Sequence, residues 1–513
     1  MMEETSTPSR SLVLRHPLRL VLAGLGLGIL FDVLFNGKML GVNAPAFTLM
    51  VLASLTVVLG WERVRPLVTN LWLPAVLLFF AGMVAVRDNG LLTFLNVCAC
   101  LGLLALIAVY QVQKPTGPIG LVEIVLAPLR AVVGSLGHAG QAARRGLRPL
   151  GGARGEARRK AMPVLRGLLL AIPVLFIFGA LLASADLIFA ERIRQVLGPE
   201  LLRTVGRWTG HLVVAVAAGF VLAGGLAYAV RQRRDDWVDD VSSVRTPHLS
   251  GVTEVSIMIS SVNLLFFLFV LIQIPYLFGG QVNVVPGKFT YAEYARRGFG
   301  ELVAVAVLVF GLLVVMRGLA PHDNRRQTLA FKVPATFLVG LTCVLLASAF
   351  KRLLLYEQAY GFTQMRIYPH VFMVWLAALL AWLAVCLWLR RDLLAIGVLV
   401  AALGFAGTLD LLNPDAFVVR ENLQMALSQQ AEPDPRERFV DAVYFEELSA
   451  DAVPELLIAA EQLTDRRGQE IESGLRRRFE AMQRGTRWRQ WPSLHLARNR
   501  AYRLLVERFD GDN

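Results

Sequence analysis

Two connectors between apolar segments combine arginine with tyrosine, a pairing suited to binding anions. In residues 291–301, helical spacing puts Tyr294, Arg297 and Glu301 on one face. Arginine offers paired donors for phosphate or carboxylate, and tyrosine joins a polar tip to an apolar body. The first predicted binding face comprises Tyr291, Glu293, Tyr294, Arg296, Arg297 and Glu301.

A second face has the same character in residues 351–368. Arg352, Tyr356 and Tyr360 follow one another at intervals of four residues. The full set is Lys351, Arg352, Tyr356, Tyr360 and Arg366. An alternative stays open for both faces: the tyrosines form an aromatic belt, and the arginines extend to the membrane surface only to anchor helix ends.

Polar side chains inside apolar segments form a third group of candidates. A charge at the centre of a bilayer costs about 3 kcal/mol, so each such residue needs a partner or a function. The predicted intramembrane polar residues are Asp32, Asp186, Asn263, Gln273 and Asp410. The three acids and Glu301 fall at the same predicted side, although each could simply cap a helix or pair with an arginine.

Signatures of catalysis and of cofactor binding are absent. The seven histidines are scattered without the spacing of a metal site, and no nucleotide-binding sequence is present. Gly24-x-x-x-Gly28 lies inside an apolar segment and predicts a close helix-packing surface. We therefore expect no catalytic residue, metal or cofactor.

The segments that must position these residues are apolar. The 513 residues are 55% hydrophobic and 18% charged, with a mean hydropathy of +0.54, which is too apolar for an ordinary soluble protein. In lipid, uninterrupted runs of about 20 apolar residues must be helical. They are predicted at 18–35, 42–60, 67–86, 91–110, 164–188, 209–230, 253–278, 299–316, 333–350, 369–389 and 393–412. The expected fold is all-α: a polytopic transmembrane bundle of about 11 helices.

The distribution of basic residues predicts the orientation. The net charge of +13 is attributed to Lys and Arg in cytoplasmic connectors, and no nucleic-acid partner is expected. The N-terminus and the even-numbered connectors contain more Lys and Arg, so they are assigned to the cytoplasm. The connector 111–163 joins an apolar stripe to seven basic residues and is expected to lie on the membrane, although its Arg/Gly part could be a disordered linker.

The composition changes after residue 412. We expect residues 1–412 to be the transmembrane domain and residues 413–513 to be a small soluble helical domain, on the extracytoplasmic side if the helix count is odd. Asn413 and Pro414 predict a helix start, Ser449 a helix cap, and Gly485 a helix break.

Several strings resemble bacterial polytopic membrane proteins grouped as domains of unknown function 4153/4173. The resemblance covers most of residues 160–513. The matching strings are Val262–Gly280, Tyr291–Phe299, Leu355–Thr363, Asn413–Ala416, Leu448–Pro454 and Trp488–Arg498. The resemblance implies a membrane location and a shared helical plan, and no activity.

These patterns favour a non-enzymatic protein of the bacterial inner membrane, with the bilayer as its partner. Its external surface would bind an anionic lipid, an envelope glycan or a partner protein. Two other classes stay open. A transporter would line its path with Asn263 and Gln273, whereas a transferase would use Glu293, Glu301 or Asp186 as a base.

Overall fold

The computed structural model is built from helices. It describes residues 15–67, 70–111, 121–147, 199–230, 252–278, 299–319, 325–389, 393–429, 440–463 and 465–510, and these ranges contain no strand. The expected all-α fold is confirmed for this part of the chain.

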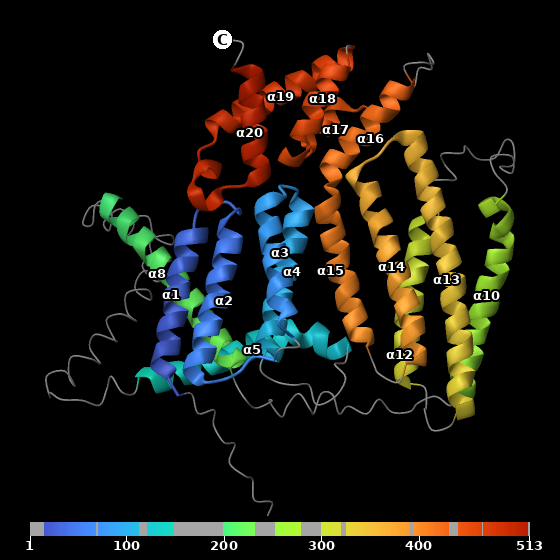
Figure 1. The fold of residues 1–513 in the computed structure, drawn as a ribbon, viewed down its shortest axis with the longest axis horizontal. Coiled ribbons are helices and arrows are strands. Elements are labelled where there is room, and N and C mark those ends of the chain that lie inside the picture. Colours follow the sequence, from blue (N-terminus) through green and yellow to red (C-terminus); the bar gives the residue numbers. More distant parts are fainter. Residues whose placement is uncertain are drawn as a thin grey trace, which may run out of the picture.

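Ten helices form one bundle, in which most stand upright and α8 runs obliquely (Figure 1). They are α1 (Pro17–Phe35), α2 (Asn43–Glu62), α3 (Trp72–Val86), α4 (Gly90–Tyr110), α8 (Pro199–Ala229), α10 (Val252–Phe278), α12 (Phe299–Leu319), α13 (Arg325–Tyr360), α14 (Gln364–Trp388) and α15 (Leu394–Leu412). Among the described residues, nine helices are long and apolar enough to cross a membrane, and α3 is a shorter apolar helix. This is the architecture of a multi-pass membrane protein.

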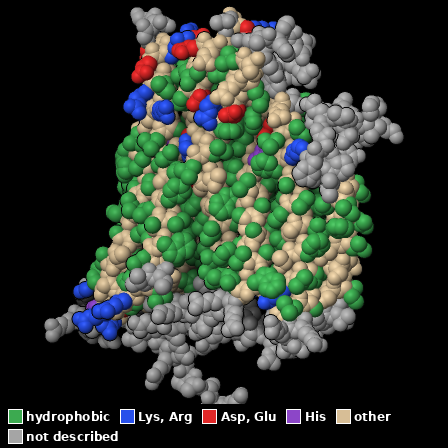
Figure 2. All heavy atoms as spheres, turned by 45° about the vertical axis from the view of Figure 1, so that its right-hand side comes forward, with side chains coloured by type: hydrophobic (Ala, Val, Ile, Leu, Met, Phe, Trp, Pro, Cys, Tyr) green, Lys and Arg blue, Asp and Glu red, His purple; other side chains and the backbone are tan. Residues whose placement is uncertain are grey.

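The outer surface of the bundle suits a lipid environment. Figure 2 shows apolar side chains over the middle of one face, with charged side chains gathered near its two ends. Large apolar side chains such as Ile29, Leu308 and Ile272 are exposed on their helices. Such surface is unfavourable in water but is matched by hydrocarbon chains.

Most predicted segments coincide with a helix, but their lengths differ. The segment predicted at 67–86 starts only at Trp72, because the N–H of Leu67 donates to the carbonyl of Gln111 (2.8 Å) and the chain is not helical there. The segment predicted at 333–350 extends to the 36 residues of α13, about 54 Å at 1.5 Å per residue. The segment predicted at 164–188 lies outside the described residues.

Glycines allow α1 to pack closely against α8. A Cβ on Gly24 would lie 2.3 Å from the Cβ of Ala223, and one on Gly28 would lie 2.1 Å from the carbonyl oxygen of Ala215. Gly26, between them, has no neighbour within 4 Å. The predicted Gly24-x-x-x-Gly28 packing surface is thus confirmed, with α8 as its partner.

Helix α5 (Leu121–Leu147) lies across one end of the bundle, near the start of α1 (Figure 1). Its apolar residues Val125, Leu129, Val132 and Leu136 are exposed. A helix across the bundle end with an exposed apolar stripe is the geometry expected for the membrane interface. Of the basic residues that follow in the connector 111–163, Arg144 and Arg145 belong to the last turns of α5, and those from Arg148 onward lie outside the described part.

The C-terminal helices lie over the opposite end of the bundle (Figure 1). They are α16 (Pro414–Gln429), α17 (Ala442–Glu447), α18 (Val453–Gln462), α19 (Arg466–Arg484) and α20 (Leu496–Phe509), with short 3-10 turns at Ala450–Ala452, Arg487–Arg489 and Trp491–Ser493. We call residues 414–510 the C-terminal unit. Buried residues such as Phe445, Leu475 and Leu505 form its core.

Local signals fix several boundaries of this unit. Asn413 takes a left-handed conformation (φ 54°) between α15 and α16. The Ser449 side chain caps the turn at Ala450–Ala452, and α19 ends at Arg484 with Gly485 as its C-cap. The predictions for these positions are confirmed.

Candidate functional site

The connector between α3 and α4 joins the bundle to the C-terminal unit. The Nε of Arg87 donates to the carbonyl of Asp410 (2.7 Å), and its Nη1 lies 3.4 Å from the Oδ1 of Asp451. The backbone N–H of Asp88 donates to the other oxygen of Asp451 (2.6 Å). The buried Asp451 therefore holds two successive residues of this connector.

Asp415 makes a second link at the start of α16. Its Oδ1 accepts a hydrogen bond from the Nδ2 of Asn89 (3.0 Å) and another from the side chain of Gln364. Its Oδ2 accepts from the backbone N–H of Ser449 (3.0 Å). Because Asn89 also caps α4, one carboxylate connects α4, α14, α16 and the turn at Ser449.

Asp88 provides the third link. An Nη2 of Arg498 in α20 lies 2.5 Å from its Oδ1, and the N–H of Ala450 donates to its Oδ2 (3.4 Å). Both carboxylate oxygens are thus occupied. The Nη1 of Arg498 is buried and has no hydrogen-bond partner in the described structure.

Arg478 of α19 supports the chain on the other side of the same turn. Its guanidinium donates to the carbonyls of Glu446 (2.9 Å), Leu448 and Ser449 (3.0 Å). These carbonyls lie at and beyond the end of α17, where the helix dipole is negative. Burial lowers the pKa of Arg478 from its usual value, and the nearby charges of Asp88, Asp415 and Glu446 oppose that effect.

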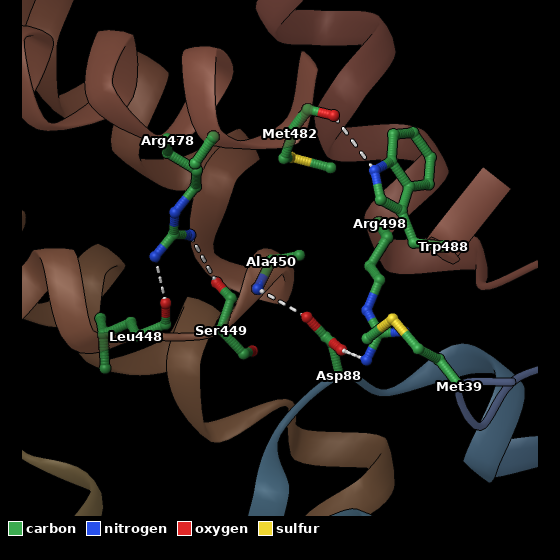
Figure 3. A pocket seen from close by; sticks show the side chains of 10 residues that line it. Met39, Asp88, Leu448, Ser449, Ala450, Arg478, Met482, Trp488 and Arg498 are labelled. Atoms are coloured by element: carbon green, nitrogen blue, oxygen red, sulfur yellow. Dashed lines mark hydrogen bonds and ion pairs between the residues drawn. The ribbon is translucent and has the colours of Figure 1, made fainter. Parts of the chain in front are cut away.

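A pocket of about 360 Å³ opens between these groups (Figure 3). Its polar part is formed by Asp88, Ser449, Arg478 and Arg498. Its apolar part is formed by Met39, Leu448, Ala450, Ala481, Met482 and Trp488. The Trp488 ring is fixed by a hydrogen bond from its Nε1 to the carbonyl of Met482 (3.1 Å). We call this the junction pocket.

Two titratable groups are buried beside the pocket. Burial raises the pKa of Asp451, against the hydrogen bond from Asp88 and the charge of Arg87, which lower it. Burial lowers the pKa of His495, against the charge of Asp88, which raises it, and the Nδ1 of this ring has no hydrogen-bond partner in the described structure. Both shifts favour the neutral form, as expected for groups removed from water.

The predicted arginine–tyrosine faces are only partly described. Glu301 is exposed in the first turn of α12, and the other residues of the first face lie outside the described part. In the second face, the guanidinium of Arg366 lies 4.3 Å from the centre of the Tyr356 ring and donates to the carbonyls of Tyr360 (3.1 Å) and Gly361.

Arg366 thus closes the end of α13, and the Tyr356 and Tyr360 rings lie 5.0 Å apart. Lys351 and Arg352 are half-buried. A headgroup site on these faces stays a prediction.

Each described intramembrane candidate has a polar partner. Asp32 accepts from Asn36 (2.7 Å) and lies 2.6 Å from the Nδ1 of His211. The Nδ2 of Asn96 donates to Asp410 (2.9 Å). Asn263 donates to the carbonyl of Pro334 (2.8 Å), which links α10 to α13. Asp186 and the side chain of Gln273 lie outside the described part.

Sequence reasoning did not single out the residues of the junction pocket as candidates. One signal was the run Arg87-Asp88-Asn89 in a very short connector between two apolar segments. A second signal is that three family-like strings, Asn413–Ala416, Leu448–Pro454 and Trp488–Arg498, meet at the junction and contain Asp415, Asp451 and Arg498. Within the described ranges, no group of three or more His, Cys, Asp or Glu residues could hold a metal ion.

Comparisons with known proteins identify the family. Neither the curated proteins nor the solved structures contain a match to this chain. The model of the family described as "Domain of unknown function (DUF4153)" matches residues 74–458. The family-like strings suggested a resemblance that begins near residue 160, but the match begins well before that residue. It ends before Arg478 and Arg498. Because it spans more than half of the sequence, the chain belongs to the DUF4153 family.

Proposed function

We propose that this chain is a non-enzymatic protein of the bacterial inner membrane that binds the headgroup of an anionic lipid in the junction pocket. The proposal depends mainly on one observation. A buried guanidinium nitrogen of Arg498 has no partner, in a pocket whose lining includes a second arginine. Leaving a charged donor buried and unpaired is costly, so an acceptor bound there would be stabilised.

The charges of the lining favour an anion. Arg478 and Arg498 face one carboxylate, Asp88, so the lining has an excess positive charge. One oxygen of Asp88 is in an ion pair with Arg498, and the other accepts a hydrogen bond from the N–H of Ala450. The lining therefore offers a free donor and no free carboxylate, which suits a phosphate or carboxylate and disfavours a cation.

The apolar side of the lining favours an amphiphile over a free anion. Met39, Met482 and Trp488 add apolar side chains to the lining, and Met39 and Trp488 lie on the same side of the pocket as Arg498 (Figure 3). Met39 belongs to the connector between α1 and α2, directly beyond two candidate spans. This position supports a pocket near the depth at which lipid headgroups meet hydrocarbon.

Native mass spectrometry of the purified protein with added phosphatidylglycerol or phosphatidylcholine tests the proposal. We expect the wild type to retain one phosphatidylglycerol molecule. In Arg498→Gln the affinity for phosphatidylglycerol should be about tenfold lower, because one charged hydrogen bond is removed. Arg498→Lys keeps the charge near Asp88 and should retain part of the binding. Arg500→Gln changes an exposed arginine of the same helix and should behave like the wild type.

Two further measurements distinguish the source of the anion and the location of the site. Competition by glycerol 3-phosphate alone would show that the pocket takes a free anion rather than a lipid. The double variant Arg297→Ala, Arg352→Ala addresses the arginine–tyrosine faces, and lipid loss in that protein alone would place the site there. Equal retention by Arg498→Gln and wild type, with both proteins folded, would overturn the proposal.

A further inference from the structure

Large apolar side chains are exposed on the C-terminal unit close to the bundle end. Trp491 is 60% exposed and Leu496 is 61% exposed, and Leu494 between them is also exposed. The neighbouring connector between α1 and α2 exposes Met39 and Leu40. We call these five residues the apolar wedge. Exposed apolar groups that cluster in this way mark an interaction surface.

The wedge is held firmly in place. The N–H of Val42 donates to the carbonyl of Leu494 (2.9 Å), and the N–H of Met39 donates to the Oγ of Ser493 (3.0 Å). A Cβ on Gly41 would lie only 2.3 Å from the Leu494 oxygen, so the two segments of the chain are in direct contact. The wedge is therefore a rigid surface that spans two segments distant in the sequence.

The position of the wedge points to the bilayer as its partner. Helix α1 ends at Phe35 and α2 begins at Asn43, so Met39 and Leu40 lie just beyond two candidate membrane spans. On those helices Val33 and Leu49 expose apolar surface of the kind that contacts lipid. The wedge continues this surface from the spans onto the C-terminal unit.

The composition of the wedge and its surroundings suits the interfacial layer. Tryptophan is favoured where hydrocarbon meets headgroups, because its ring is apolar and its N–H is polar. The preceding turn exposes Arg487 and Arg489, whose charges match anionic headgroups. A binding surface for a soluble protein would not need to lie next to the ends of membrane spans or to continue their apolar surface.

We propose that the apolar wedge is inserted in the interfacial layer of the bilayer and seats the C-terminal unit on the membrane surface. The unit is then a membrane-attached cap and not a domain that projects freely into water. This inference goes beyond the proposed function and does not depend on a ligand in the junction pocket.

Spin-label accessibility in lipid nanodiscs tests the insertion. The labels are placed by Trp491→Cys and Leu496→Cys in a full-length chain whose four cysteines are replaced by alanine. Arg466→Cys is the control, because Arg466 is highly exposed and lies about 27 Å along α19 from Arg484. We expect labels at 491 and 496 to be more accessible to oxygen than to a water-soluble nickel complex, and the label at 466 to show the reverse.

Fluorescence of the chain with its native cysteines gives a second measurement. The signal lost in Trp491→Phe is the emission of Trp491, and we expect lipids brominated near the headgroup to quench it at least twofold. Water-like accessibility at both 491 and 496, or unquenched Trp491 emission, would overturn the insertion. Such a result would show that the wedge is exposed to water and would leave the Arg498 lipid test unaffected.

Discussion

Arg498 in α20 and Asp88 between α3 and α4 form an ion pair of 2.5 Å that joins the last helix of the chain to the bundle. Both side chains are largely buried, at 20% and 16% exposure. Breaking such a pair leaves the remaining charge in a poorly hydrated place, and this is more damaging than losing an exposed pair.

Asp88→Asn should therefore destabilise the protein by about 2 kcal/mol, since Arg498 loses its counter-charge. Thermal unfolding in detergent and the rate of proteolytic release of the C-terminal unit measure the effect. Glu470→Gln is the control, because its pair with Arg466 (2.8 Å) is exposed and should contribute less than about 0.5 kcal/mol. Equal shifts of the melting temperature in the two variants would show that the Asp88 pair stabilises the protein no more than an exposed pair does.

The contact of α1 with α8 gives a sharper steric prediction. Gly28→Ala should destabilise the bundle by about 1–3 kcal/mol, because the new Cβ would lie 2.1 Å from the Ala215 oxygen and the helices must move apart. Gly26→Ala, two residues earlier, meets nothing within 4 Å and should be neutral or slightly stabilising. Melting temperatures of the two variants, prepared identically, make the comparison; a similar loss in both would contradict this packing.

Much of the fold follows from the sequence, because lipid allows an apolar run of 20 residues only one satisfied backbone conformation. Residues 18–35 or 393–412 therefore become helices whatever their neighbours. Which helices meet is a different matter. The sequence marks Gly24 and Gly28 as a close-packing surface, but α8 is distant along the chain and nothing local identifies it as the partner.

The candidate site was harder to predict for the same reason. Asp88 and Arg498 are far apart in sequence, and the position of each by itself is typical of an ordinary surface charge. Arg366 illustrates the opposite difficulty. Its type suggests an anion site, yet its guanidinium lies on the last carbonyls of α13 because Gly361 turns the chain there in a left-handed conformation.

Acidification should weaken the junction through His495. Because burial lowers the pKa of this histidine in the folded protein, the unfolded chain takes up the proton first as the pH falls below about 6.5. The stability that depends on neutral His495 is therefore present above that pH and is lost below it, by up to about 1.4 kcal/mol per pH unit.

Melting temperatures of wild type and His495→Gln between pH 7.5 and pH 5 test this sign. On acidification, the melting temperature of the wild type should fall relative to that of His495→Gln. The subtraction removes most of the contribution of Asp451, whose raised pKa acts in the opposite sense at lower pH. A difference that stays constant over this range would contradict the role of His495.

We predict that the C-terminal unit faces the extracytoplasmic side of the membrane. The start of α1 and the C-terminal unit lie at opposite ends of the bundle (Figure 1), and basic residues favour the cytoplasm for the N-terminus. Green fluorescent protein fused after Asn513 should therefore be dark and alkaline phosphatase fused there should be active, whereas an N-terminal green fluorescent protein should be bright. Bright fluorescence from the C-terminal fusion would place the junction pocket at the cytoplasmic leaflet, and lipids of that leaflet would then be its ligands.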